Sequence, residues 1–231
     1  HAAQLKAADA DVVMAPETAI PLLPGQLPEG YWDALVSMFD EGDGEGAKRA
    51  ALIGVPLGSF EQGYSNSVVG LKAGQVEPYR YDKHHLVPFG EFIPFGFHWF
   101  VNMMNMPLGD FRRGLPVQPS MAVADQRVAP NICYEDLFGE EIAASLRHAD
   151  QPATMLANVT NLAWFGDTIA LDQHLQISRM RALETGRPML RATNTGATAV
   201  VRPDGSVQAR LPVFTLGTLQ ADVQGTQGLT P

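Results

Sequence analysis

The stretch Val128-Ala129-Pro130-Asn131-Ile132-Cys133-Tyr134-Glu135-Asp136-Leu137 decides how the rest of the chain is interpreted. It holds the only cysteine of the 231-residue sequence, at a point where an apolar, strand-like run meets a helix-like continuation. A strand that turns abruptly into a helix leaves its last side chain near backbone N–H groups that can bind a developing oxyanion. A free cysteine is also often a small buried hydrophobe. The neighbouring segments therefore decide whether Cys133 is a nucleophile.

Strand-like and helix-like segments alternate along the chain on both sides of that stretch. Apolar runs predict buried strands at Asp11–Glu17, with Glu17 just past the strand end, and at 50–57, 66–71, 76–81, 153–160, 189–194, 198–202 and 207–211. Periodic or capped segments predict helices at 1–8, 30–39, 138–147 and 168–187. The hairpin-length turn 72–75 adds antiparallel pairing. We therefore expect an α/β fold with mixed pairing, in a single domain covering 1–231.

Composition excludes several classes of protein. A net charge of −9, a pI near 5.0 and the lack of a basic run argue against nucleic acid as a partner. One cysteine excludes an internal disulfide and a cysteine-built zinc site, and the six histidines show no metal-ligand spacing, so we expect neither metal nor cofactor. No run approaches the roughly 18 apolar residues of a membrane helix. Because residues 1–8 read as a running helix without an initiator Met, we expect a fragment of a longer protein.

Two further reactive side chains lie at the ends of expected elements. Glu17 follows the first apolar strand, and Lys83 follows a tyrosine-rich strand. A thiol with a pKa near ~8.5 is mostly protonated at neutral pH, so a nucleophilic cysteine needs a base and a positive charge nearby. Glu17 could supply the base, and Lys83 could stabilise the thiolate and then an oxyanion, together with the N–H of Tyr134. Taken singly, each charged residue could equally be a solvated surface group.

The segment from Leu86 to Pro107 is unusually rich in aromatic residues, methionine and proline. Prolines at 88, 94 and 107 break it into short pieces. Its apolar side chains could belong to the core. They could also form an adaptable surface for a lipid or a partner protein, in which case we expect much of the segment to lie exposed beside Cys133.

Three blocks of the sequence resemble a known family. Ala15-Pro16-Glu17, the run Tyr81–Glu91 and Asn131-Ile132-Cys133-Tyr134-Glu135 are similar to the Glu, Lys and Cys blocks of the nitrilase, or carbon–nitrogen hydrolase, superfamily. The likeness covers nearly the whole chain. It implies an α-β-β-α sandwich, with two mixed sheets flanked by helices, and a catalytic triad of Glu17, Lys83 and Cys133.

Within that superfamily the sequence resembles the bacterial apolipoprotein N-acyltransferases most specifically. The motifs that carry this likeness are Lys-x-His-Leu-Val-Pro-Phe-Gly-Glu from Lys83, Ile-Cys-Tyr-Glu from Ile132, Ala-Trp-Phe-Gly from Ala163 and Arg-Met-Arg-Ala-Leu-Glu from Arg179. The resemblance implies that Cys133 takes an acyl chain from a phospholipid as a thioester. It then passes the chain to the α-amino group of the lipid-modified N-terminal cysteine of an apolipoprotein.

The same resemblance implies roles for individual residues. Glu17 would be the base, Lys83 the stabiliser of thiolate and oxyanion, and Cys133 the nucleophile. The supporting or substrate-binding residues would be Glu91, Tyr134, Glu135 and Trp164. By the same likeness, the parent protein would hold this domain on the periplasmic side of the bacterial inner membrane, through membrane helices absent from this chain. The first strand of the family fold would also precede His1.

The sequence departs from the family pattern at one position, and two other functions stay open. Leu162 follows Asn161 where members often carry an acidic residue, so no polar role is expected at 162. One alternative is a soluble amidohydrolase that uses the same triad and releases the acyl group to water. The other is a catalytically inactive domain that binds a lipidated partner through the segment 86–107.

Overall fold

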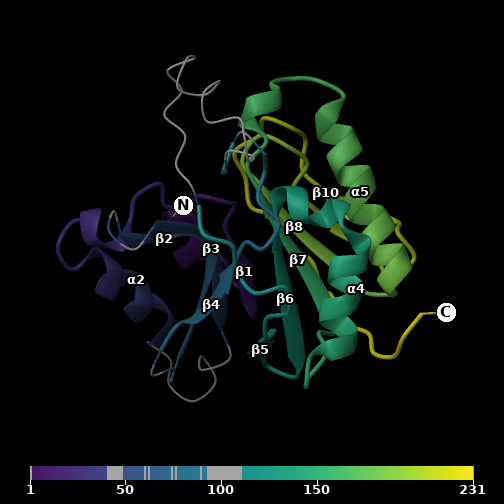
Figure 1. Cartoon of the computed structure of the whole chain (residues 1–231), viewed down its shortest axis with the longest axis horizontal. Coiled ribbons are helices and arrows are strands. Elements are labelled where there is room, and N and C mark those ends of the chain that lie inside the picture. Colours follow the sequence, from purple (N-terminus) through teal and green to yellow (C-terminus); the bar gives the residue numbers. More distant parts are fainter. Residues whose placement is uncertain are drawn as a thin grey trace.

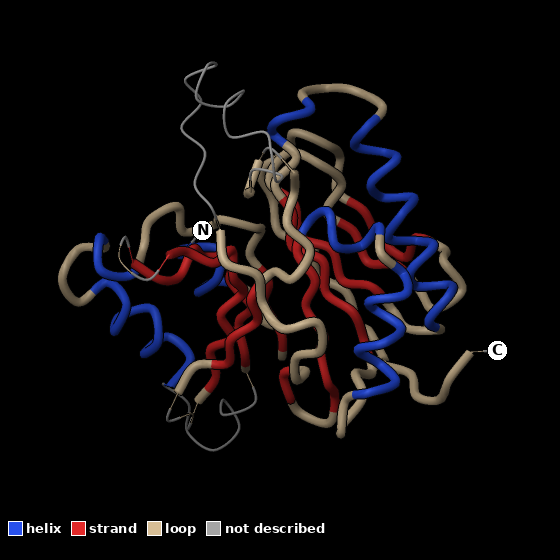
Figure 2. The backbone as a smooth tube through the Cα atoms, viewed as in Figure 1, coloured by secondary structure: helices blue, strands red, loops and turns tan. Residues whose placement is uncertain are grey.

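A computed structural model describes residues 2–40, 49–59, 61, 63–73, 75, 77–88, 90–92 and 111–230. Two β-sheets lie face to face in the middle of the molecule, and helices cover their outer faces (Figures 1 and 2). This arrangement is the α-β-β-α sandwich expected from the sequence. Within the described residues, no helix is long and apolar enough to cross a bilayer.

The first sheet contains four strands in the order β1-β2-β3-β4. They are β1 (Val12–Met14), β2 (Ala50–Ser59), β3 (Gly63–Lys72) and β4 (Tyr79–Asp82). Strand β1 pairs with β2 in parallel, whereas β2 with β3 and β3 with β4 are antiparallel. Helices α1 (Ala2–Ala7) and α2 (Tyr31–Asp40) and the short turn η1 (Pro24–Gln26) belong to this half of the molecule.

The second sheet contains six strands in the order β10-β9-β8-β7-β6-β5. They are β5 (Met121–Val123), β6 (Gln126–Ile132), β7 (Met155–Thr160), β8 (Met189–Thr193), β9 (Ala199–Val201) and β10 (Val207–Arg210). The three central strands β6, β7 and β8 are parallel, and the outer strands pair antiparallel. Both sheets are therefore mixed, as predicted. Helices α4 (Gly139–His148) and α5 (Ala170–Thr185) lie on the outer face of this sheet (Figure 1).

Side-chain alternation along the strands separates three apolar layers. On β2, Ala51, Ile53 and Val55 pack toward α1 and α2, while Ala50 and Leu52 face the second sheet. On β7, Met155, Ala157 and Val159 face the first sheet, while Leu156 packs toward the helices with Ile142 and Leu175. Each sheet is therefore apolar on both faces, and buried apolar runs are what the sequence shows for these strands.

Most of the expected elements are present, with differences at particular places. Cys133 is followed by a 3-10 turn, η3 (Cys133–Leu137), and then by α4, which agrees within one residue with the helix expected at 138–147. The loop 161–166 contains one further 3-10 turn, η4 (Ala163–Phe165), and the sequence did not predict the short edge strand β5. In the aromatic segment Leu86 is buried, but residues 93–107 lie outside the described residues, as does the expected loop 41–46.

Candidate active site

The structure brings the three predicted catalytic side chains together across the interface between the sheets. Glu17 follows β1, Lys83 follows β4 and Cys133 follows β6. The first two therefore come from one sheet, and the thiol comes from the other. Lys83 Nζ lies 3.7 Å from Glu17 Oε1, and the exposed fractions of Lys83 and Glu17 are only 1% and 8%.

Glu17 is placed by a tight crossing of the chain over strand β2. After β1 ends, the N–H of Ala15 donates to Leu52 O and the N–H of Ile20 donates to Gly54 O, so the intervening loop lies against β2. A Cβ atom at Gly54 would lie 2.4 Å from Pro16 O and 2.6 Å from Glu17 Cα. Only glycine allows this approach, so Gly54 sets how deeply Glu17 enters the site.

Both carboxylate oxygens of Glu17 accept hydrogen bonds. Asn66 Nδ2 donates to Oε1 at 2.7 Å, and the backbone N–H of Asn161 donates to Oε2 at 2.7 Å. Asn66 lies on β3 and Asn161 directly follows β7, so the two donors come from different sheets. The orientation of the predicted base therefore depends on the packing of both sheets.

Lys83 is a buried cation between two carboxylates. Its Nζ lies 2.9 Å from Glu91 Oε2, and Asn66 Nδ2 donates to Glu91 Oε1 as well as to Glu17. The N–H of Val87 donates to Glu91 Oε2 at 2.8 Å, which fixes Glu91 in turn. Burial alone lowers the pKa of Lys83, but the negative charges of Glu17 and Glu91 outweigh it, so the pKa is raised. Lys83 therefore stays protonated, as an oxyanion stabiliser must.

Cys133 adopts a left-handed backbone conformation, with φ +51°, at the end of β6. A non-glycine residue in this region carries strain, and such strain often accompanies a functional turn. Burial raises the pKa of the thiol to about 12. The charge of Glu17 adds to this effect, while the charge of Lys83 and the hydroxyl of Thr160 oppose it. The thiol is therefore neutral at rest and needs a base to remove its proton during attack.

Glu135 connects the backbone just after Lys83 to the turn η3, called here the nucleophile turn because it begins at Cys133. Its buried carboxylate accepts from the N–H groups of His84 and His85 on one side, and from the N–H of Ile132 and Tyr81 Oη on the other. Burial raises the pKa of Glu135, and these four hydrogen bonds oppose the shift. These four hydrogen bonds join β4 and the backbone after Lys83 to the end of β6, which is the geometry of a supporting residue.

Comparison with known proteins agrees with this geometry. The family model for carbon-nitrogen hydrolases matches residues 1–230. The chain belongs to the carbon-nitrogen hydrolase family. Its fold resembles that of a CN-hydrolase superfamily protein from Xanthomonas campestris, solved with an arsenic adduct in its active site. The TM-score is 0.58 at 18% identity, over 90% of this chain and 77% of that one.

Two relatives of this carbon-nitrogen hydrolase are named apolipoprotein N-acyltransferase. The protein from Ralstonia nicotianae is 72% identical over 222 residues, which cover 96% of this chain and 42% of the relative. The protein from Verminephrobacter eiseniae is 54% identical over 96% of this chain and 40% of its own length. The chain thus spans less than half the length of the curated relatives that it matches.

The two remaining predicted site residues are Tyr134 and Trp164. Tyr134 directly follows Cys133, and its ring packs edge-on against Phe138 with 5.2 Å between centroids. The His85 ring stacks on the Phe138 ring, with 3.4 Å between their centroids. Trp164 is 86% exposed on η4, three residues after Asn161, whose N–H binds Glu17. Trp164 is therefore close in sequence to a residue that binds the predicted base, but its own side chain is exposed to solvent.

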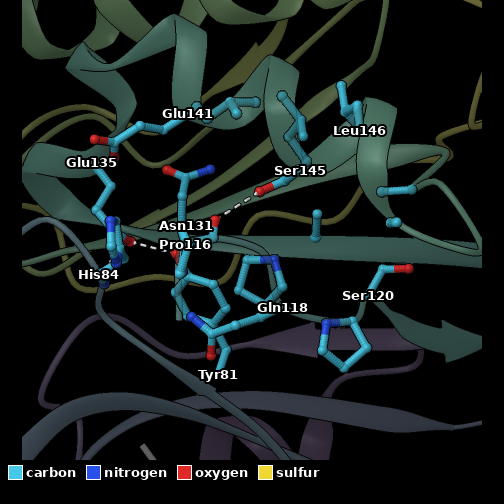
Figure 3. Close-up of a pocket in the computed structure, with 17 residues that line it drawn as sticks. Tyr81, His84, Pro116, Gln118, Ser120, Asn131, Glu135, Glu141, Ser145 and Leu146 are labelled. Carbon is cyan, nitrogen blue, oxygen red and sulfur yellow. Dashed lines mark hydrogen bonds between the residues drawn. The ribbon is translucent and has the colours of Figure 1, made fainter. Parts of the chain in front are cut away.

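A small hollow lies beside strand β6 (Figure 3). It has a volume of about 40 Å³, enough for a few water molecules. Glu135 and Asn131 line it together with Ser145 and Leu146 of α4. Asn131 Nδ2 is buried and has no hydrogen-bond partner among the described residues. A volume of this size is too small for a lipid chain.

Sequence reasoning missed several residues that organise the site. Asn66 bridges Glu17 and Glu91, and Asn161 fixes Glu17 through its backbone. One signal was available for Asn66. The run Ser65-Asn66-Ser67 places polar residues on both faces of an otherwise apolar strand, and all three are buried. Buried polar side chains on a strand indicate a polar network, because each one needs a partner.

Proposed function

We propose that this chain is the catalytic domain of an apolipoprotein N-acyltransferase. The domain moves a fatty acyl chain from a phospholipid to the α-amino group of the lipid-modified N-terminal cysteine of an apolipoprotein. The observation that carries this proposal is the 72% identity, over 96% of the chain, to a relative of that name. The arrangement of Glu17, Lys83 and Cys133 supports the chemistry, because acyl transfer through a thioester needs a base, a cation and a thiol at one point.

In the first half-reaction Cys133 Sγ attacks the ester carbonyl of the phospholipid. Glu17 accepts the thiol proton as the S–C bond forms, so no free thiolate is required. The carbonyl oxygen becomes an oxyanion that the Lys83 ammonium and the N–H of Tyr134 stabilise. The C–O bond to the glycerol oxygen then breaks, and the protonated Glu17 returns its proton to that oxygen. A lysophospholipid leaves, and the acyl chain remains on Cys133.

In the second half-reaction the α-amino group of the apolipoprotein attacks the thioester carbonyl. Glu17 accepts a proton from the amine, and the same oxyanion site stabilises the second tetrahedral intermediate. The C–S bond breaks, Glu17 protonates the departing sulfur, and the product is an amide. Each step uses the same three groups, so the resting enzyme is regenerated without a cofactor.

The loop after β7 supports a lipid donor. Trp164, Phe165 and Ile169 are 86%, 50% and 73% exposed on this loop, next to the Asn161 N–H that holds Glu17. Each CH₂ of an acyl chain that leaves water gains roughly 0.8 kcal/mol, so exposed apolar side chains on this loop would favour a lipid substrate. We propose a location at the bacterial inner membrane, with this domain on the periplasmic face and membrane attachment through other parts of the full-length protein.

The acyl-thioester intermediate is the test of this function. Full-length protein incubated with a phospholipid donor, and without acceptor, should give an acyl adduct on the Cys133 peptide in mass spectrometry. The Cys133→Ala variant is the control and should carry none. An adduct that persists in that variant would refute the role of Cys133.

Addition of a diacylglyceryl peptide separates the transferase from the amidohydrolase. With a donor whose acyl chain carries a label, a transferase should move the label from the thioester to the peptide amine. Loss of the label as free fatty acid, at the same rate with and without the peptide, would favour the hydrolase.

A further inference from the structure

A buried polar network lies behind the nucleophile turn, and the proposed chemistry does not use it. Asn158 on β7, Arg191 on β8, Asp136 in η3 and Ser178 on α5 are all at most 2% exposed. Burying an arginine and an aspartate in this way costs several kcal/mol per ion before pairing is counted. A buried polar network can hold the segments that it joins in one arrangement, so the segments that this network contacts indicate what it positions.

Arg191 is the centre of the network. Its Nη1 donates to Asn158 Oδ1 at 3.1 Å and to Ser178 Oγ at 2.7 Å, and its Nε donates to Ala197 O at 3.1 Å. Ser178 Oγ in turn donates to Asp136 Oδ2 at 2.7 Å, which lies 3.6 Å from Arg191 Nη1. One guanidinium therefore fixes both an amide on β7 and a carboxylate in the turn.

Asn158 passes this constraint to the nucleophile itself. Its Nδ2 donates to the carbonyl oxygen of Cys133 at 3.3 Å and to Asn131 Oδ1 at 2.6 Å. The residue whose carbonyl is held in this way is the one with φ +51°. A left-handed non-glycine residue persists only where its surroundings hold it, because the conformation costs on the order of 1–2 kcal/mol.

The turn is thus held at both ends from the same side. Cys133 is tethered through Asn158, and Asp136 is tethered through Ser178, with Arg191 behind both. We propose that Arg191, acting through Asn158 and Asp136, is a positioning residue that holds the turn Cys133–Asp136 in its reactive conformation. This proposal rests on Cys133 being the nucleophile of the proposed function, but it does not depend on the identity of donor or acceptor.

The electrostatics agree with a geometric role. Burial lowers the pKa of Arg191, and the negative charges of Asp136 and of the Cys133 thiolate oppose that shift. Asp136 itself disfavours the thiolate, so the two charges of the pair act on Cys133 in opposite directions. The opposite signs of these two charges fit a network whose role is to hold the position of the turn.

The chain offers a matched control for Arg191. Arg187 is also buried, at 3% exposure, and lies just before the same strand β8. Within the part of the chain that the structure describes, its guanidinium donates to the backbone carbonyls of Ala153, Thr185 and Gly228 and to no side chain. Replacing either arginine removes a buried guanidinium, but only Arg191 is linked to the nucleophile turn.

The test compares Arg191→Met, Asn158→Leu and Arg187→Met in the full-length protein. For each variant, thermal unfolding gives the folded fraction, and the rate constant for iodoacetamide alkylation of Cys133 is measured from pH 6 to pH 10. We expect Arg191→Met and Asn158→Leu to alkylate about 10- to 100-fold more slowly per folded molecule, since displacement of a reacting group by about 1 Å can cost a hundredfold. Arg187→Met should lose stability and keep the wild-type rate profile.

Two outcomes would overturn the proposal. One is wild-type alkylation in folded Arg191→Met or Asn158→Leu. The other is an equal loss of alkylation in Arg187→Met, which would indicate general destabilisation. If Arg191→Met does not fold, Asn158→Leu decides, because it keeps the Arg191–Asp136 pair. Thiol alkylation needs no lipid, so its result stands even if acyl transfer to an apolipoprotein is not observed.

Discussion

The substitution Gly54→Ala should separate folding from catalysis. The added Cβ would lie 2.4 Å from Pro16 O, 2.6 Å from Glu17 Cα and 2.7 Å from Thr18 N. All three contacts are with backbone, so no flexible side chain can move aside. Restoring an ordinary contact of about 3.4 Å requires the loop that carries Glu17 to move by about 1 Å, and overpacking of this kind costs typically 1–3 kcal/mol.

A shift of that size should remove most of the activity while leaving the fold. Displacement of a catalytic group by about 1 Å can cost on the order of a hundredfold, so we expect about a hundredfold slower formation of the Cys133 thioester in a single-turnover assay. Gly25→Ala is the control, because a Cβ at Gly25 has no atom within 4 Å. Circular dichroism should show both variants folded. A rate for Gly54→Ala within about twofold of the control would refute the placement of Glu17 as the base.

Other consequences of the structure can be measured directly. Lys83→Arg keeps the charge but replaces a compact ammonium with a planar guanidinium. We expect about 3 kcal/mol of lost transition-state stabilisation, or about a hundredfold in turnover, and near wild-type turnover would show that Lys83 does not bind the oxyanion. Burial lowers the pKa of His174 to about 3, whereas the same side chain in the unfolded chain has a pKa of about 6.5. Between these two values the unfolded state binds a proton that the folded state does not, so the free energy of unfolding falls as the pH drops from about 6.5 to 3. Asp136, whose pKa burial raises from 3.8 to about 6, acts in the opposite direction between those two values. The two shifts together leave a net loss of roughly 2 kcal/mol by pH 3, and of less than about 1 kcal/mol by pH 4.5. Urea unfolding at pH 7 and pH 4.5 should therefore show a smaller acid loss for His174→Gln than for wild type, and equal losses would contradict this reasoning.

The sequence predicted the elements of this fold well because most of its strands are short apolar runs between clear stops. Pro16 ends the first strand before Glu17, and Gly186, with φ +60°, ends α5 where a glycine was expected to end it. Strand pairing could not be predicted in the same way. The antiparallel pairing of β2 with β3 depends on a turn at Gly63, and an apolar run such as 50–57 fits parallel and antiparallel neighbours equally.

The three site blocks were visible in the sequence, but their supports were not. Glu17, Lys83 and Cys133 were predicted from strand-end positions and from resemblance, and the structure brings them to one interface. Asn66 contacts Glu17 and Glu91, 49 and 25 positions away along the chain, and Gly54 approaches a loop 36 to 38 positions away. A local sequence pattern could not predict these contacts, because they depend on how the strands cross in the folded protein. The positive φ of Cys133 is likewise a property of the packed turn, since cysteine has no preference for it.

The division of the triad between the two sheets has a consequence for the lifetime of the protein. Glu17 and Lys83 belong to the first sheet and Cys133 to the second, so a group on the thiol that also contacts Lys83 links the two layers. A thioester stays on the chain when the chain unfolds, so only the contacts that the acyl group makes in the folded state alone raise the free energy of unfolding. A contact between the acyl group on Cys133 and Lys83 would be of that kind and would make the sheets harder to separate. The enzyme would then be most resistant to unfolding and proteolysis while it waits, loaded, for an acceptor, and the supply of donor would govern its survival as well as its turnover.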